Sequence, residues 1–284
     1  MKYIFLFAVA ISMSLTATAQ DAMSVWTDQP IAIDGKANEW PAFFRFYAPG
    51  TKFQFDVLND KTNLYVCVRA TEVDAQARLM HSGLTLWFDV SGKKKQKTGL
   101  SFPVKLEHGG GEGAIVETTR SRGQDNGAGQ SLRNRVNRLR ERVLLSQSMI
   151  KPISLPGISD QMLPLTNSNG LTVAYGWDSL DILFVEYQVP LALIYGHPAT
   201  ADDMKKPLGF GLVSGAMDAP ERHGGGGGGG GMGNNAGMSG SGSGRGMGGR
   251  PGGMTGQGQT MNGSAYDPNN AEQKTWLKLH LESK

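Results

Sequence analysis

Alternation of apolar and polar side chains recurs in short runs along most of this 284-residue chain. In one run the apolar positions are Phe53, Phe55 and Val57. A period of two residues places successive side chains on opposite faces of a β-strand, so it predicts strands with one buried face. The runs that alternate, or are apolar and bounded by turns, are Ser24–Ile33, Lys52–Leu58, Leu64–Ala70, Gly83–Val90, Leu100–Leu106, Leu171–Trp177, Ile182–Val189, Leu208–Val213 and Trp276–Leu281.

Two pairs of these runs are joined by polar turns and predict β-hairpins. The first turn, Ser91–Lys95, is rich in lysine, and the second is Asp178–Asp181. Many strands and few helices favour an all-β fold, an antiparallel β-sandwich.

The last run also predicts its own orientation. Leu277, Leu279 and Leu281 have the same parity and form the expected inward row, which puts Trp276 on the opposite face with Lys278. Three buried leucines contribute about 1.5 to 3 kcal/mol each, so this strand is expected to be an integral part of the sandwich.

Two segments have helical rather than strand character. Asp74–His81 predicts one or two helical turns between strands. Ser131–Gln147 predicts an amphipathic helix, because leucine and valine recur at helical spacing while five arginines occupy its other faces. A solvated arginine face explains this pattern, and an anionic surface or partner protein stays open. Nucleic acid is disfavoured, because the formal net charge is only +3 and no aromatic residues accompany the arginines.

Composition divides the chain into segments. Residues 224–263 hold 21 of the 40 glycines and neither an aromatic nor an acidic residue, so they lack the side chains to build a core. We therefore expect a β-sandwich domain over 20–223, a disordered Gly/Met-rich loop over 224–263, and a closing strand of the same sandwich within 264–284.

The first 19 residues have a pattern typical of a signal peptide. Lys2 precedes a short apolar run, and Ala17 and Ala19 form a small-x-small cleavage pattern. The apolar run is shorter than the roughly 20 residues of a membrane-spanning helix. The single cysteine, Cys67, lies inside an apolar strand and not at the expected mature terminus, so no lipid anchor is expected and the thiol is interpreted as a small core residue. The sequence thus predicts an exported protein that does not span the membrane and is periplasmic or secreted.

Four segments follow one another in the order found in a known family: Ile33–Trp40 (IDGKANEW), Asn59–Val66 (NDKTNLYV), Leu86–Asp89 (LWFD) and Glu186–Leu191 (EYQVPL). They resemble the motifs of domains similar to family 9 carbohydrate-binding modules. The chain is also similar to exported Bacteroidetes-type proteins of unknown role, which join such a domain to a Gly/Met-rich loop and a closing strand like Trp276–Leu279. The resemblance implies a β-sandwich and, by family habit, sugar binding.

Sugar-binding members of that family hold a pyranose ring between exposed aromatic side chains. Of the five tryptophans, Trp40 and Trp87 are interpreted as core residues, because they lie in a scaffold motif and in a continuous apolar strand. Trp26, Trp177 and Trp276 are the candidate ligand-binding residues, because they lie near the mature terminus, at a hairpin turn and on the outer face of the last strand.

The sequence gives little support for catalysis. The neighbouring acids Asp178 and Asp181, and likewise Asp202 and Asp203, are explained as turn and helix-cap residues. The main hypothesis is a non-catalytic carbohydrate-binding protein. The alternatives are a structural or partner-binding envelope protein on the same sandwich and, less favoured, a glycoside-active enzyme.

The sequence also contains little that indicates a metal site. The five histidines share no metal-ligand spacing, and no cofactor is expected. A structural calcium ion stays open, because related sandwiches often carry one, and loop-adjacent candidates for it are Asp34, Asp60 and Asp89.

Overall fold

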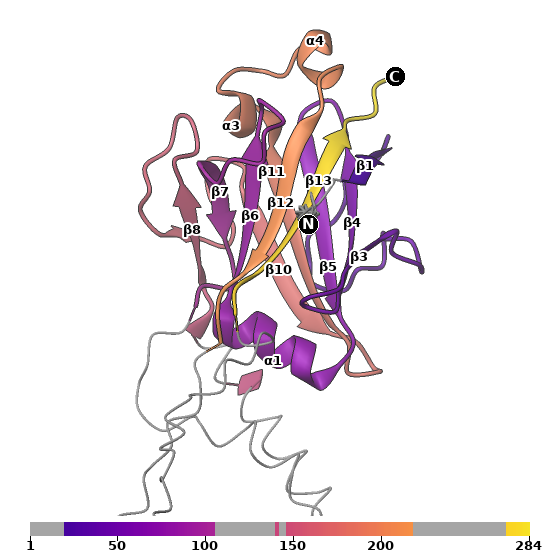
Figure 1. The fold of residues 1–284 in the computed structure, drawn as a ribbon, viewed down its shortest axis with the longest axis vertical. Helices are drawn as coiled ribbons and strands as arrows, with labels where there is room; N and C mark the ends of the chain where they lie inside the picture. Colours follow the sequence, from indigo (N-terminus) through magenta and orange to yellow (C-terminus); the bar gives the residue numbers. More distant parts are fainter. Residues whose placement is uncertain (1–19, 106–139, 142–145, 218–270) are drawn as a thin grey trace, which may run out of the picture.

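The computed structural model describes residues 20–105, 140–141, 146–217 and 271–284. Two β-sheets pack face to face, with helix α1 (Val73–Ser82) at one end and the short helices α3 (Leu191–Tyr195) and α4 (Ala201–Met204) at the other (Figure 1). The predicted all-β sandwich is confirmed. Its strands are β1 (Gln20–Met23), β2 (Val25–Trp26), β3 (Phe46–Ala48), β4 (Phe53–Asn59), β5 (Asn63–Ala70), β6 (Leu84–Asp89), β7 (Thr98–Ser101), β8 (Met149–Ile153), β9 (Leu163–Pro164), β10 (Thr172–Trp177), β11 (Leu183–Pro190), β12 (Leu208–Ser214) and β13 (Gln273–His280).

Pairing between the strands is mostly antiparallel. The seven-stranded sheet has the order β1-β13-β12-β6-β7-β8-β9, and the six-stranded sheet has the order β10-β11-β5-β4-β2, with β3 also paired to β4. Both predicted hairpins, β6–β7 and β10–β11, are present. Two pairs are parallel, β1 with β13 and β2 with β4, so the prediction of an antiparallel sandwich holds for all but these pairs.

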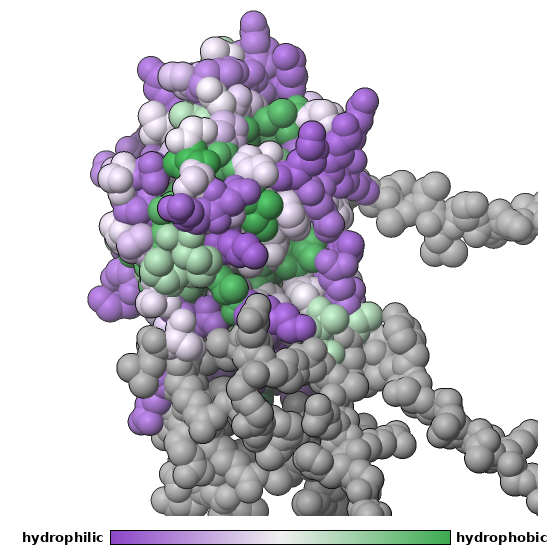
Figure 2. Space-filling model, turned by 90° about the vertical axis from the view of Figure 1, so that its left-hand side faces the viewer, coloured by the Kyte–Doolittle hydropathy of each residue, from purple (hydrophilic) through white to green (hydrophobic). Residues whose placement is uncertain are grey.

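The main core lies between the two sheets and follows the alternation in the sequence. On β4, Phe53, Phe55 and Val57 are completely buried and face apolar residues of the other sheet, such as Phe210 of β12, whose ring lies 6.2 Å from that of Phe55. Viewed from the β8 side, the surface carries hydrophobic residues interspersed among hydrophilic ones (Figure 2).

Strand β13 is paired on both edges, because it lies between β1 and β12. Leu277, Leu279 and Leu281 are only 3%, 0% and 5% exposed, which confirms the predicted inward row. Trp276 and the exposed Lys278 lie on the outer face. The predicted helical turns at Asp74–His81 are confirmed as α1.

The expected strand Ser24–Ile33 is wrong. The chain changes sheets at Ser24, whose side chain donates a hydrogen bond to Asn59, so that β1 belongs to the seven-stranded sheet and β2 to the other. Beyond Trp26 the chain leaves the sheet, and Pro30 has no N–H to donate to a strand ladder.

The segment 27–45 covers the outer face of the six-stranded sheet. It contributes apolar side chains to a smaller hydrophobic cluster on that face, which we call the second core. As a result, both faces of this sheet are buried over part of their area. The buried members of the second core are Ile31, Trp40, Leu58, Tyr65, Cys67 and Phe184.

One buried carboxylate holds this segment in place. Glu186 on β11 is completely buried. Its Oε2 accepts hydrogen bonds from the backbone N–H groups of Asp34 (3.0 Å) and Gly35 (2.6 Å), and its Oε1 accepts one from Trp40 Nε1 (2.8 Å). Burial raises the pKa of Glu186, and the three hydrogen bonds oppose that rise because they favour the carboxylate.

Gly35 is needed for this attachment. Its φ is +79°, which favours glycine, and a Cβ there would lie 2.7 Å from the backbone carbonyl of Tyr175. The segment Ile33–Trp40, which the sequence singled out, is therefore a docking element for the sheet.

Three predicted segments lie wholly or largely outside the described residues: the leader 1–19, the Gly/Met-rich loop 224–263 and the arginine-rich helix Ser131–Gln147, of which only 140–141 and 146–147 are described. Among the described residues, no helix is long and apolar enough to cross a membrane.

Replacing Leu279 with alanine is expected to destabilise the protein by about 2 to 5 kcal/mol, because it leaves a cavity in the main core. Lys278→Ala in the same strand is the matched control and should change the free energy of unfolding by less than about 0.5 kcal/mol. Chemical denaturation measures both. Equal stability of the two variants would show that β13 is peripheral.

Replacing Glu186 with alanine is expected to cost about 3 kcal/mol or more, because three donors lose their common acceptor in a buried place. Gln188→Ala, two residues along the same strand, should cost about 1 kcal/mol or less. Thermal unfolding of the two variants tests this. An unchanged melting temperature for Glu186→Ala would contradict the role given to its carboxylate.

Candidate functional site

The outer face of the seven-stranded sheet carries two tryptophans in one row. Gly211 on β12 pairs with Trp276 of β13 on one side and with Trp87 of β6 on the other. Gly99 on β7 pairs with Trp87 from the far side. We call Trp276, Gly211, Trp87 and Gly99 the tryptophan row.

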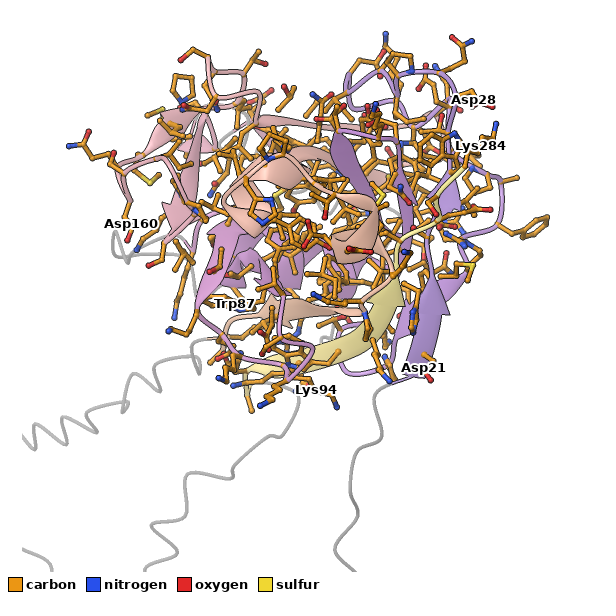
Figure 3. The ribbon with its side chains drawn as sticks, turned by 90° about the horizontal axis from the view of Figure 1, so that it is seen from above. Asp21, Asp28, Trp87, Lys94, Asp160 and Lys284 are labelled. Atoms are coloured by element: carbon orange, nitrogen blue, oxygen red, sulfur yellow. The ribbon has the colours of Figure 1, made fainter. Side chains whose placement is uncertain are left out.

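The core position predicted for Trp87 is wrong. Its neighbours Leu86 and Phe88 are buried in the main core, whereas Trp87 is partly exposed on the outer face (Figure 3). The run Leu84–Asp89 looks continuously apolar because a large aromatic residue occupies an outward position. The signal that could have revealed this is parity, since Leu84, Leu86 and Phe88 already fill the inward positions.

Each tryptophan ring lies over the glycine of a neighbouring strand. A Cβ on Gly211 would come within 2.8 to 2.9 Å of three atoms in the six-membered ring of Trp276. A Cβ on Gly99 would lie 2.9 Å from Cε3 of Trp87. Both glycines are buried although they face outward. The missing side chains therefore let the two rings lie close to the sheet instead of standing upright from it.

The two rings belong to strands that are two positions apart. Adjacent strands are about 4.8 Å apart, so Trp87 and Trp276 start from backbones about 9.5 Å apart on one flat surface. Flat aromatic faces with this kind of separation suit an extended ligand whose own flat units repeat along its length.

Polar side chains lie in the adjacent row of the same face. Val213 pairs with Lys274 and with Thr85, and Ser101 pairs with Thr85 and with Lys151. Thr85 and Ser101 are joined by a hydrogen bond of 3.2 Å between their hydroxyls. Hydroxyl and ammonium groups thus run beside the tryptophan row.

One donor within the tryptophan row has no acceptor among the described residues. Nε1 of Trp87 is buried and has no hydrogen-bond partner in the part of the chain that the structure describes. Buried indole N–H groups usually have a partner, so this donor is an exception within the described fold.

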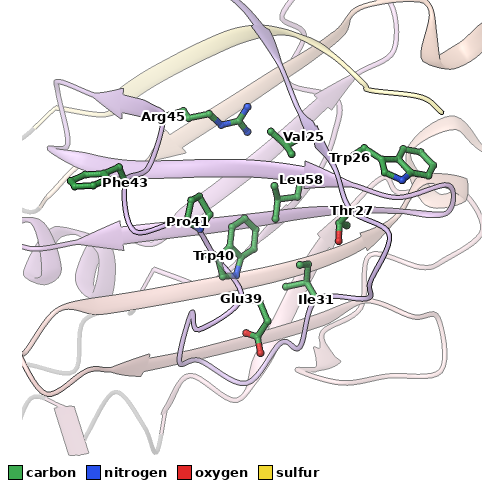
Figure 4. Close-up of a pocket in the computed structure, with 10 residues that line it drawn as sticks. All are labelled: Val25, Trp26, Thr27, Ile31, Glu39, Trp40, Pro41, Phe43, Arg45 and Leu58. Carbon is green, nitrogen blue, oxygen red and sulfur yellow. The ribbon is translucent and has the colours of Figure 1, made fainter.

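Trp26 lies on the other side of the sandwich. Its Nε1 donates to Asp28 at 2.9 Å, and it borders an open depression next to the second core. In Figure 4, Trp26 and Trp40 lie on opposite sides of Leu58 and Thr27, so their rings do not form a clamp. The depression is lined by Val25, Trp26, Thr27, Ile31, Glu39, Trp40, Pro41, Phe43, Arg45 and Leu58.

Trp177 is held by contacts within the protein. Its Nε1 donates to Oε1 of Gln76 at 3.0 Å, and the guanidinium of Arg140 lies 5.0 Å from its ring centre. The ring also packs against the main core. The structure therefore places Trp26, Trp177 and Trp276 in three separate locations, and it is Trp87 that shares a surface with Trp276.

The core position predicted for Trp40 is confirmed, since this residue is 6% exposed. The interpretation of Cys67 as a small core residue is also confirmed, because it is completely buried and free. Burial raises the pKa of its thiol well above the ordinary value, and the carboxylates of Glu186 and Asp56 raise it further. A thiol in this state is a poor nucleophile.

The three aspartates considered for calcium use their oxygens in turns. In each case one Oδ1 accepts a hydrogen bond from the backbone N–H two residues ahead. Burial opposes ionisation of Asp60, but the hydrogen bonds to its carboxylate outweigh this effect and lower its pKa. In the part of the chain that the structure describes, no group of three or more His, Cys, Asp or Glu side chains could hold a metal ion. The turn pairs are Asp34 with Lys36, Asp60 with Thr62, and Asp89 with Ser91.

The neighbouring acids have structural roles, as predicted. Asp178 accepts hydrogen bonds from two backbone N–H groups of its own hairpin turn, both at 2.9 Å. Asp203 forms a capping box with Thr200 at the start of α4, and Asp202 forms an ion pair with Lys205 at 3.0 Å.

Of three comparisons with known proteins, two found no match. No family model matches this sequence, and no curated protein matches it. Among solved structures, the chain is similar to a family 9 carbohydrate-binding module from Caldicellulosiruptor kristjanssonii, determined in complex with glucose. The match has a TM-score of 0.34 and 8% sequence identity, and it covers 70% of this chain and 80% of that one.

Gly211→Ala tests whether the Trp276 ring lies over the glycine. We expect a loss of about 1 to 3 kcal/mol in stability, because the new Cβ overlaps the ring. Adding Trp276→Ala to the same chain should remove most of that loss, and unfolding measurements on the four members of the double-mutant cycle test this. Strictly additive effects would contradict the contact.

Proposed function

We propose that this protein is a non-catalytic glycan-binding protein whose sugar rings stack on Trp87 and Trp276. The observation that carries the proposal is the tryptophan row, in which glycines let two partly exposed rings lie flat on a sheet face. The C–H face of a pyranose is apolar and packs on an indole ring, while its hydroxyls need polar partners.

The surroundings of the row supply those partners. The hydroxyl of Thr85 and the ammonium groups of Lys151 and Lys274 lie one row away on the same face.

The place of action belongs to the same proposal. The leader at 1–19 supports export to the periplasm or beyond, where polysaccharides are accessible. The acids considered for catalysis are engaged in turns, caps and ion pairs, which supports binding without hydrolysis.

A second candidate function is docking to an envelope protein. It is favoured by exposed apolar side chains around the depression beside the second core, on the side of the sandwich opposite the tryptophan row. Phe43 is 87% exposed and Val25 is 40% exposed, and both line the depression. Exposed apolar residues that gather in one area are typical of protein interaction surfaces.

Trp276→Ala and Trp87→Ala are expected to weaken glycan binding about tenfold each, because each removes one stacking ring. Affinity gel electrophoresis of the full-length chain against a panel of soluble polysaccharides measures this. Trp26→Ala is the matched control and should bind as the unmodified chain does.

Two results would contradict the proposal. One is the absence of binding to every polysaccharide in the panel. The other is binding that Trp26→Ala or Phe43→Ser abolishes while Trp276→Ala and Trp87→Ala leave it intact, which would move the site to the depression.

A further inference from the structure

Three segments that are distant in sequence bring seven lysines to one side of the tryptophan row, where β6 ends and β12 begins. Four lie in the turn of the β6–β7 hairpin, two follow α4, and one is on β13. In Figure 3, Lys94 lies on the same side of the molecule as Trp87, the outer side of the seven-stranded sheet. The seven are Lys93, Lys94, Lys95, Lys97, Lys205, Lys206 and Lys278, and we call them the lysine rim.

Strand register and close contacts show that the lysine rim is continuous. Gly209 pairs with Lys278 on one side and with Asp89, the last residue before the hairpin turn, on the other. A Cβ on Gly209 would lie 3.4 Å from the backbone N of Lys94. One on Gly92 would lie 3.3 Å from the carbonyl oxygen of Pro207, so the hairpin turn touches the segment that follows α4.

The acids near the lysine rim offset only part of its charge. The carboxylate of Asp89 is buried and accepts hydrogen bonds from the backbone of its own turn. Asp202 pairs with Lys205 at 3.0 Å, and Asp21 lies 3.8 Å from Lys278. Among the described residues, no ion pair is formed by Lys93, Lys95, Lys97 or Lys206, and all four are exposed.

The lysine rim and the tryptophan row are close enough to act on one ligand. Lys278 is two residues beyond Trp276 on β13, and Asp89 is two residues beyond Trp87 on β6. Two residues along a strand span about 7 Å, which is within reach of a lysine side chain from a group at the edge of a stacked ring.

We propose that the ligand is an acidic polysaccharide built from uronic acids. This inference rests on the proposed glycan-binding function and names its substrate class. The sugar rings stack on Trp276 and Trp87, and their carboxylates point along the strands toward the lysine rim. A uronate carboxylate is attached directly to the ring, so it lies at the ring edge when the ring face rests on an indole. Lysine ammonium groups are compact point charges that donate hydrogen bonds to such a carboxylate without a fixed two-point geometry.

The test compares polygalacturonate with the same polymer after methyl esterification, which removes the charge and keeps the sugar. Affinity electrophoresis of the full-length chain is expected to show tighter binding to the acid form at low salt, and the difference should shrink as salt screens the charges. The triple variant Lys93→Ser, Lys95→Ser, Lys97→Ser should lose about tenfold in affinity for polygalacturonate and keep its affinity for the ester.

A matched control removes the same charge from three lysines outside the lysine rim. The triple variant Lys36→Ser, Lys61→Ser, Lys284→Ser should bind both polymers as the unmodified chain does. Thermal unfolding of both triple variants should be close to that of the unmodified chain, because all of these lysines are exposed.

The outcomes separate this inference from the proposed function. Equal, tryptophan-dependent binding to the acid and the ester would overturn the uronate assignment and keep glycan binding. Binding to polygalacturonate that depends on the lysines but not on Trp276 would overturn stacking as the basis of recognition. Tighter tryptophan-dependent binding to dextran sulfate than to polygalacturonate would replace uronate with a sulfated sugar and overturn the assignment.

Discussion

The buried carboxylate of Glu186 determines which face of this sandwich is covered and which is open. It accepts three hydrogen bonds from the segment 27–45 and so holds that segment against the six-stranded sheet. Without an acceptor at this position the segment would leave buried donors unpaired. The six-stranded sheet therefore has apolar clusters on both of its faces, whereas the seven-stranded sheet keeps an outer face with partly exposed tryptophans.

Two glycines let the tryptophan rings on that outer face expose their flat faces. A sheet position normally projects a side chain outward, and upright side chains around an indole would cover its flat face. Gly211 and Gly99 remove two of them, so the rings of Trp276 and Trp87 lie over the gaps. The rigidity of the paired backbone then fixes the distance between the rings, which a loop-borne pair could not achieve as precisely.

Local patterns in the sequence were sufficient for much of the fold. Alternation on β4 and β13 predicted their inward rows, because burial on one face leaves a period of two in the sequence. The change of sheet at Ser24 could not be seen, since it depends on two partners that are distant along the chain, Asn59 and His280. Trp276 was identified as an outward residue, but the tryptophan row was not, because its members come from four strands and meet only through register.

Two interactions contribute to the proposed recognition at this face, ring stacking and charge pairing. The fold places them on different elements. Stacking depends on rings fixed by paired strands, so its strength is set by the sheet and is insensitive to salt. Charge depends on a hairpin turn and on the segment after α4, which lie at the end of the sheet and are exposed. Since turns accept substitution more readily than paired strands, the lysine content of the hairpin turn can change the preferred charge of the ligand while Trp276 and Trp87 stay in place. Affinity for a flat ring and selection for its charge are thus separable properties of one surface.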